Sequence, residues 1–259
     1  MKQSILNKLH EIEEKYQIKI LFAIESGSRA WGFPSVDSDY DVRFIYTKSL
    51  NEYLKVNHTD DFLDFAINDD LDFKGWDLKK FLKLMYASNA TPFEWIQSPI
   101  FYISKDDFII EINQILSNYF CQQTLTHHYL GLSKKKTEQL DDKNIKLKDL
   151  FYVLRSLLAA KYCLVKNECP PMEFSKLIFL VDNETILNEI NTLQQLKSKT
   201  DERFLSTISN ELKVYIADLY KEISVSIKIK SKGNCDNDLL NTTYLKLLQH
   251  ANDRFFKEK

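Results

Sequence analysis

The chain has 259 residues, of which 44% are hydrophobic, and this length is enough to bury one large core or two modest ones. Thirty-five Lys and Arg against thirty-seven Asp and Glu leave a formal charge of −2, which excludes a general electrostatic attraction to nucleic acid. Four cysteines show neither a CxxC pair nor a ligand spacing, which argues against a zinc site or a disulfide framework.

No segment has the pattern of a membrane span or a signal peptide. The N-terminal sixteen residues are charged and amphipathic, and no run of about eighteen apolar residues occurs in the chain. We therefore expect a cytoplasmic protein without a membrane contact, and nothing in the sequence indicates an obligate protein partner.

The first hundred residues alternate between helical and strand patterns. Apolar residues at helical spacing precede a fully apolar run, and a second strand with alternating polar and apolar residues follows a loop that contains Pro34. Asp77 stands where a helix N-cap is expected. In chain order we predict a helix at 5–16, strands at 18–24 and 40–46, a short helix at 51–56, strands at 62–67 and 71–76, a helix at 78–86 and a strand at 100–103.

From about residue 106 the pattern becomes helical throughout. Apolar residues recur at helical intervals in five segments, with breaks at 167–171, 199–201 and 230–237. The segments are 108–120, 146–165, 184–197, 204–223 and 239–256. We therefore predict an α+β protein with a catalytic domain, 1–105, built on a small mixed sheet, followed by an all-helical domain, 106–259.

Two aspartates one residue apart follow a Gly-Ser turn by ten residues. Gly27 and Ser28 end the first apolar strand, and Asp39 and Asp41 open the second, where alternation points both carboxylates the same way. Such a pair suits two Mg²⁺ ions, about 3.5–4 Å apart, in phosphoryl or nucleotidyl transfer. Gly27 would let the backbone approach a triphosphate, and Ser28 would donate to its oxygens.

The Gly-Ser turn followed by two aspartates resembles the motif of the DNA-polymerase-β nucleotidyltransferase superfamily. The longer sequence segments resemble more closely its RNA-ligase-associated (RlaP) group, which includes YcgL-type proteins. The matching segments run from residue 25 to about 177, and the last eighty residues have no counterpart in this comparison. They are ESGSRAWGF, SDYDVRFIY, LDFKGWDLKKFLKL, FEWIQSPIFY, FYVLRSLLAAKY and PPMEF. The resemblance implies a mixed-sheet catalytic domain, a helical domain, Mg²⁺ (with Mn²⁺ as a substitute), an NTP donor and a link to RNA end repair.

The superfamily has a third carboxylate on a neighbouring strand, which can ligate metal and take the proton of the attacking hydroxyl. Three residues compete for this role. Asp72 in LDFKGW is our first choice, and Asp77 of the GWDLKK segment is second because it also suits a helix N-cap. Asp64 lies outside the matching segments and ranks last.

Several cations are candidate nucleotide contacts. Arg29 directly follows the Gly-Ser pair and would bind a phosphate or pair with a nearby carboxylate, while Lys74 shares the predicted face of Asp72. In the helical half, Arg155 and Lys161 would touch the triphosphate or form ordinary salt bridges. Tryptophans 31 and 76 offer stacking faces for a base, although packing is the commoner role. The basic runs 134–136 and 228–232 are interpreted as solvated surface.

Together these features predict a Mg²⁺-dependent enzyme that moves a nucleoside monophosphate from an NTP, such as ATP, to a hydroxyl. An RNA 3′ end is the first candidate acceptor. A protein side chain, as in adenylylating antitoxins, and a small molecule stay open as alternatives. A different class of function, a catalytically silent NTP-binding or RNA-binding regulator, is disfavoured by the intact GS and DxD motifs.

Overall fold

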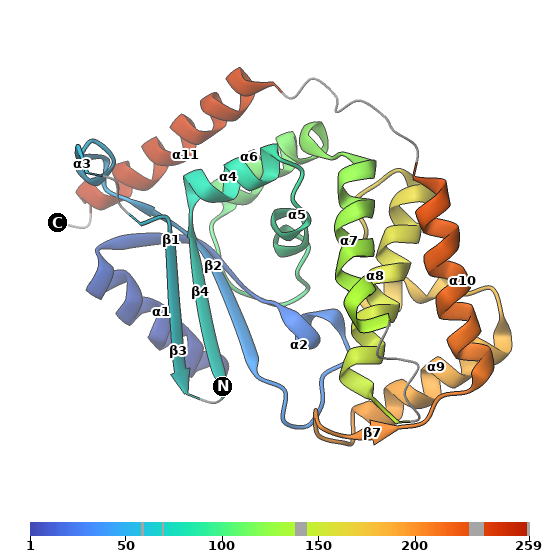
Figure 1. Cartoon of the computed structure of the whole chain (residues 1–259). Helices are drawn as coiled ribbons and strands as arrows, with labels where there is room; N and C mark the ends of the chain where they lie inside the picture. Colours follow the sequence, from blue (N-terminus) through green and yellow to red (C-terminus); the bar gives the residue numbers. More distant parts are fainter. Residues whose placement is uncertain (58–59, 69, 138–143, 228–235, 258–259) are drawn as a thin grey trace. The chain divides into compact units, whose positions relative to one another are not determined.

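The computed structural model describes residues 1–57, 60–68, 70–137, 144–227 and 236–257 (Figure 1). Contacts between Cα atoms divide these residues into two compact units. The sheet unit contains residues 1–27, 39–119 and 236–257, and the helical unit contains residues 28–38 and 120–227. The loop between the Gly-Ser turn and the DxD motif therefore belongs to the helical unit.

The sheet unit is built on five strands in the order β3-β4-β2-β1-β5. The β2–β4 pair is parallel, and the β1–β2, β1–β5 and β3–β4 pairs are antiparallel, so the sheet is mixed. The strands are β1 (Ile18–Glu25), β2 (Tyr40–Lys48), β3 (Phe62–Asn68), β4 (Leu71–Asp77) and β5 (Phe101–Ser104).

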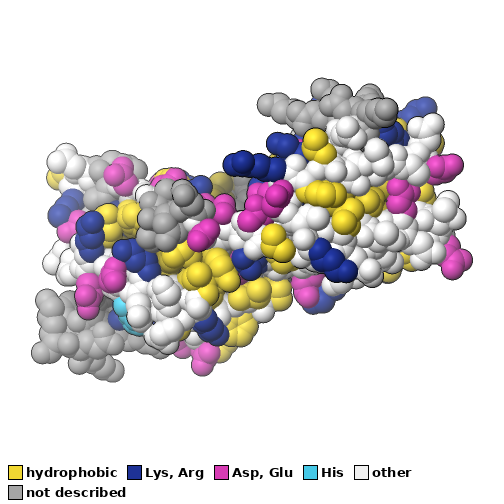
Figure 2. Space-filling model, turned by 90° about the horizontal axis from the view of Figure 1, so that it is seen from below, with side chains coloured by type: hydrophobic (Ala, Val, Ile, Leu, Met, Phe, Trp, Pro, Cys, Tyr) yellow, Lys and Arg dark blue, Asp and Glu magenta, His cyan; other side chains and the backbone are white. Residues whose placement is uncertain are grey.

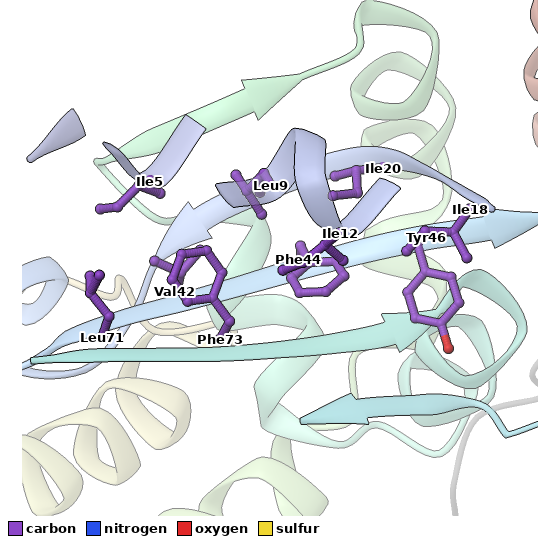
Figure 3. Packing of buried hydrophobic residues seen from close by; sticks show 11 residues of the cluster. Ile5, Leu9, Ile12, Ile18, Ile20, Val42, Phe44, Tyr46, Leu71 and Phe73 are labelled. Carbon is purple, nitrogen blue, oxygen red and sulfur yellow. The ribbon is translucent and has the colours of Figure 1, made fainter. Parts of the chain in front are cut away.

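One face of this sheet is covered by helix α1 (Lys2–Tyr16). Its buried residues Ile5, Leu9 and Ile12 follow one another at helical spacing and point toward the strands (Figure 3). From β2, Val42 and Phe44 enter the same cluster. Because alternate strand residues face opposite sides, Asp41 and Arg43 project from the other face.

Helices α4 (Leu78–Tyr86) and α5 (Ala90–Ile96) connect β4 to β5 in the sheet unit, and α6 (Asp106–Ile115) follows β5. Asp77 caps α4 as predicted, because its Oδ1 accepts the Lys79 amide hydrogen over 2.8 Å. Phe108 of α6 packs on Phe22 of β1 with a ring-centroid distance of 5.6 Å. The unit also contains α3 (Leu50–Tyr53), η1 (Leu116–Tyr119) and α11 (Asn237–Lys257), which contacts α4 and α6.

The helical unit is organised around α8 (Leu147–Lys166), which is buried along most of its length and packs on α7 (Gln122–Thr137). Helices α9 (Glu184–Lys197) and α10 (Asn210–Ser226) also contact α8. Two short 3₁₀ helices, η3 (Phe174–Lys176) and η4 (Ile178–Leu180), follow it. A two-stranded ladder joins β6 (Ile145–Lys146) to β7 (Leu205–Ser206). Within the described ranges, no helix has the length and apolarity needed to cross a lipid bilayer.

Most predicted elements are confirmed, and the differences have local causes. Helix 184–197 has the predicted bounds, whereas the segment predicted as helix 204–223 starts with β7 and becomes helical only at Asn210. Ser209 accounts for this start, because its hydroxyl accepts the Leu212 amide hydrogen over 3.0 Å as an N-cap. The prediction missed α2 (Gly27–Trp31), which begins at the Gly-Ser turn, as well as α5 and the β6–β7 ladder, and it placed no bounds on α7.

The compact units divide the chain differently from the predicted boundary at residue 105. Helix α6 lies beyond that boundary, yet Phe108 packs into the sheet unit, and α11 returns to the same unit from the C-terminal end. The loop 28–38 belongs to the helical unit although it lies inside the predicted catalytic domain. Local periodicity identifies helices but carries no signal of which unit each helix joins. As a division into functional domains, 1–105 and 106–259 stays a prediction.

Candidate active site

The Gly-Ser turn brings the backbone at the end of β1 against Asp41. The Ser26 amide hydrogen bonds the Asp41 carbonyl over 2.8 Å, and Gly27 has a left-handed φ of 60°. A Cβ on Gly27 would lie 2.0 Å from Asp41 Oδ2, so no larger residue fits there without moving the carboxylate. The glycine is therefore required by the neighbouring aspartate as well as by its backbone conformation.

Asp41 and Asp72 lie side by side on parallel strands. They are register partners in the β2–β4 pair and project from the same face, opposite the α1 core. A single nitrogen of Arg43, Nη2, donates to Asp41 Oδ1 over 2.7 Å and to Asp72 Oδ2 over 2.9 Å. Lys74, the next residue on this face of β4, lies 3.2 Å from Asp72 Oδ2. We call Asp41, Arg43, Asp72 and Lys74 the carboxylate–cation cluster.

This cluster is accessible to solvent and balanced in charge. The side chains of Asp41 and Asp72 are 28% and 27% exposed, and that of Arg43 is 14% exposed. Two carboxylates that approach each other repel unless a cation lies between them. Here the guanidinium of Arg43 is that cation. The sequence placed Arg43 on the face of Asp41 but did not identify it as a site residue.

A buried carboxylate supports the start of β2. Glu25 is almost completely buried, and its Oε1 accepts the Asp41 amide hydrogen over 2.9 Å while its Oε2 accepts the Tyr102 hydroxyl hydrogen. Ser98 also donates its hydroxyl hydrogen to the Glu25 carbonyl over 2.7 Å. Glu25 therefore fixes the backbone that carries Asp41. Sequence reasoning missed this role, although an acidic residue at the end of an apolar strand was a signal that it must find donors.

Asp39 precedes β2 and is exposed. Among the residues that the structure describes, no three His, Cys, Asp or Glu side chains lie close enough together to hold a metal ion. The structure thus brings together Asp41 and Asp72 but does not assemble them with Asp39 into a three-carboxylate cluster. The donor set fits a hard divalent cation in its chemistry, since it consists of carboxylate oxygens and already holds a cationic group between them.

The alternative third acid, Asp77, lies at the other end of β4. It pairs in register with Tyr46, five residues and about 16 Å along the strand from Asp72. Its carboxylate accepts the Tyr53 hydroxyl over 2.7 Å, and burial raises its pKa above the ordinary value. Asp64 is exposed on β3 and pairs with Lys74, one strand further from Asp41 than Asp72. Of the three candidates, only Asp72 is adjacent to Asp41.

The remaining predicted residues lie in the helical unit. Ser28 and Ser38 share a hydrogen bond of 3.1 Å between their hydroxyl oxygens, and Arg29 Nη2 donates to the Ser38 carbonyl over 2.6 Å. Arg155 is 3% exposed, and its Nε donates to the Met172 carbonyl over 3.1 Å. Lys161 donates to the Leu180 carbonyl over 3.3 Å and lies 3.7 Å from Asp182.

Both candidate tryptophans are used in packing. Trp31 makes an edge contact with Tyr152 at a centroid distance of 4.9 Å, and the Arg155 guanidinium lies 4.4 Å from the centre of the Trp31 ring. Trp76 stacks on Trp95 with a centroid distance of 4.1 Å.

Figure 2 shows acidic and basic side chains intermingled on the face in view. The basic run 228–232 lies outside the described residues.

The mixed sheet, with a Gly-Ser turn after β1 and carboxylates near the starts of β2 and β4, has the organisation of a polymerase-β-type nucleotidyltransferase. Residues 1–246 match the family described as "RlaP: RNA repair pathway DNA polymerase beta family", and the chain belongs to this family. The match extends well beyond residue 177, where the sequence resemblance ended. Family and fold are those of a polymerase-β-like nucleotidyltransferase of RNA repair.

Two individual proteins are similar to this chain. "Uncharacterized protein YcgL" of Bacillus subtilis (strain 168) is 37% identical over 204 residues, which are 78% of each chain. A nucleotidyltransferase-like protein from Exiguobacterium sibiricum 255-15, solved by crystallography, is 13% identical with a TM-score of 0.31, over 86% of this chain and 74% of that one. This structural likeness is too weak to support an argument about the site.

Proposed function

We propose that the protein is a Mg²⁺-dependent nucleotidyltransferase that moves a nucleoside monophosphate from an NTP to an RNA 3′ hydroxyl. The observation that supports this best is the pairing of Asp41 and Asp72 across parallel strands with a cationic group between their oxygens. Two carboxylates fixed beside each other by the sheet are what a divalent cation needs in a phosphate-transfer site.

Asp41 and Asp72 would hold the metal, and Asp39 would join them. When bound, Mg²⁺ would neutralise phosphate charge and lower the pKa of an acceptor hydroxyl, and Mn²⁺ can substitute for it. Asp72 would then accept the proton of the attacking hydroxyl. That hydroxyl oxygen forms a bond to the α-phosphorus of the NTP while the bond between the α-phosphorus and its bridging oxygen to the β-phosphorus breaks, and pyrophosphate leaves.

For the triphosphate we propose contacts from the Gly27 backbone, Ser28, Arg29 and Lys74. Gly27 lies directly beside Asp41, whose Oδ2 fills the space of the missing side chain, so the Gly27 backbone would be near a triphosphate bound at Asp41. Arg155 is left out of this set because it is buried, and Lys161 is left out because it lies beside Asp182, which suits the ordinary salt bridge. A phosphate contact by Arg155 would require the loss of its packing on Trp31.

We also propose that the reaction takes place in the cytoplasm. The described cysteines, Cys121, Cys163 and Cys169, form no disulfide, which suits a reducing compartment. Membership of a family described by an RNA repair pathway is in keeping with an RNA acceptor.

The proposal is tested by label transfer. The full chain is incubated with Mg²⁺ and each NTP, labelled with ³²P at either the α or the γ position, and with RNA that ends in a 3′ hydroxyl or a 3′ phosphate. We expect only the α label to join only the 3′ hydroxyl RNA, and we expect Asp41→Asn to reduce transfer on the order of 10²–10³-fold.

Asp64→Asn is the matched control, since it removes an exposed carboxylate from the outer strand β3 and should leave transfer unchanged. Transfer of the γ label, or full activity of Asp41→Asn, would contradict the proposal. An α label that appears on protein or on a small hydroxyl compound in place of RNA would keep the nucleotidyl transfer but change the acceptor.

A further inference from the structure

We propose that Arg43 is a positioning residue that holds Asp41 and Asp72 in place without metal and competes with the divalent cation for their oxygens. This inference rests on the proposed function, because it takes the two aspartates as metal ligands.

The geometry of Arg43 is that of a bridge between two strands. Its Nη2 donates to one oxygen of Asp41 and one oxygen of Asp72, at 2.7 and 2.9 Å. Its Nη1 donates to the backbone carbonyls of Asp72 and Val42, at 3.1 and 3.2 Å. The guanidinium is therefore anchored to both β2 and β4, and a single nitrogen occupies the position where one cation would bridge both carboxylates.

The orientation of Asp41 makes this competition direct. Its Oδ2 lies against the Gly27 backbone, 2.0 Å from where a Cβ would be. Its Oδ1 is linked through Arg43 Nη2 to Asp72, so Arg43 already contacts an oxygen of each proposed metal ligand. Mg²⁺ binds carboxylate oxygens at about 2.0–2.1 Å and carries two positive charges, so it would repel a guanidinium that stayed in contact with the same atoms.

Arg43 should therefore have opposite effects on two measurable properties. Its positive charge relieves the repulsion between two carboxylates in the metal-free protein and stabilises that state. The same charge weakens metal binding, because the ion must displace charge-assisted hydrogen bonds. Replacing a residue with a purely structural role would lower the stability of the protein without raising its metal affinity.

The test measures Mn²⁺ binding to the full chain by electron paramagnetic resonance, together with thermal unfolding in the absence of metal. We expect Arg43→Met to bind Mn²⁺ more tightly, on the order of 10-fold, and to unfold at a lower temperature than the wild type without metal. Lys74→Met is the matched control. Of the two carboxylates in the cluster, Lys74 pairs with Asp72, at 3.2 Å from a more exposed position, so its loss should change Mn²⁺ affinity by less than about threefold.

Unchanged or weaker Mn²⁺ binding by Arg43→Met, with binding abolished in Asp41→Asn, would overturn the role of Arg43 and leave the metal site intact. Equal Mn²⁺ binding by wild type and Asp41→Asn would instead overturn the metal site of the proposed function. If Arg43→Met does not fold, Arg43→Lys decides the question. Lysine keeps the charge but cannot bridge with a planar fork, so we expect a smaller gain in affinity, and no gain would overturn the inference.

Discussion

Arg43 of the sheet unit and two buried cations of the helical unit, Arg155 and Lys197, are held in different ways. Arg43 is partly exposed and is hydrogen bonded to two carboxylates. Arg155 is 3% exposed and Lys197 is 1% exposed, and each donates a hydrogen bond to an uncharged group. Arg155 donates to a backbone carbonyl and stacks on Trp31, and Lys197 donates to the Ser35 hydroxyl over 2.8 Å.

This difference indicates which charged residues can take part in chemistry. A cation that is buried against neutral partners is fixed by packing and contributes to stability, whereas a cluster of opposite charges at the surface can exchange one partner for a ligand. Lys197 shows the first case. Together with Gln194, which donates to the Gly32 carbonyl over 3.1 Å, it ties the loop 28–38 to α9. In this way two side chains of α9 hold the loop that connects the two motifs.

The largest expected effect is on nucleotidyl transfer, and it separates the two candidates for the third carboxylate, Asp72 and Asp77. We expect Asp72→Asn to reduce α-label transfer on the order of 10²–10³-fold, because it removes a ligand and the charge that pairs with Arg43. Asp77→Asn should leave transfer unchanged, since asparagine also caps a helix and also accepts the Tyr53 hydroxyl. Initial rates of both variants, with circular dichroism as the folding control, test this expectation. An equal loss in the two variants would show that Asp77 is not merely structural.

A comparison of three glycines separates the effect of the close contact between Gly27 and Asp41 from the effect of backbone strain. Gly27→Ala should lower the free energy of unfolding by about 1–2 kcal/mol because φ is positive, and it should also weaken Mn²⁺ binding because the new Cβ displaces Asp41. Gly32→Ala has the same type of strain, with a φ of 88°, but open space around it. It should lose stability without any loss of Mn²⁺ binding.

Gly131 of α7, in the helical unit, is a control for which the expected change in stability has the opposite sign. Nothing lies within 4 Å of its missing Cβ, so Gly131→Ala should raise the free energy of unfolding by about 0.5–1 kcal/mol. Denaturant titration measures all three variants. If Gly27→Ala and Gly32→Ala behaved alike in Mn²⁺ binding, the contact between Gly27 and Asp41 would not matter for the site.

The smallest expected effect is the pH dependence due to Lys197. Burial lowers its pKa from 10.5, while Glu202 and Asp37 raise it and Lys148 lowers it further. Between the lowered pKa and 10.5 the unfolded chain binds more protons than the folded one, so stability rises with pH in this window. We therefore expect the free energy of unfolding of the wild type, relative to Lys197→Met, to increase with pH up to about 10.4.

Lys199 is exposed, and Lys199→Met is the matched control. The difference in the free energy of unfolding between the wild type and this variant should not increase with pH in the same window. Tyrosines with raised pKa values, such as Tyr46 and Tyr53, are present in all three proteins and cancel in the differences. A difference between wild type and Lys197→Met that is flat or falls with pH would mean that Lys197 is not penalised by burial.

The sequence was sufficient for the strands of the sheet and for part of the site. Alternation along 40–46 and 71–76 predicted that Asp72 and Lys74 share a face, and the parallel register of β2 and β4 then brings Asp72 beside Asp41. The helix cap at Asp77 was predicted from the residue alone and is confirmed. These features depend on contacts within one strand or one turn, which local patterns record.

Features that depend on pairing between distant segments could not be predicted. The spacing of residues does not say that β4 pairs with β2 in parallel, so the bridge from Arg43 to Asp72 was not foreseen. The burial of Arg155 against Trp31 also joins segments more than a hundred residues apart. For the same reason, the helical pattern of α11 gave no indication that it packs in the sheet unit.

The central claim is that Asp41 and Asp72 together bind a divalent cation that seats an NTP. The most direct measurement is a crystal structure of the full chain with Mn²⁺ and a nonhydrolysable NTP, recorded at a wavelength where manganese scatters anomalously. The account predicts an anomalous peak within ligand distance of Asp41 Oδ1 and of Asp72, with Arg43 turned away from at least one of them. A bound nucleotide without an anomalous peak at these two carboxylates would contradict it.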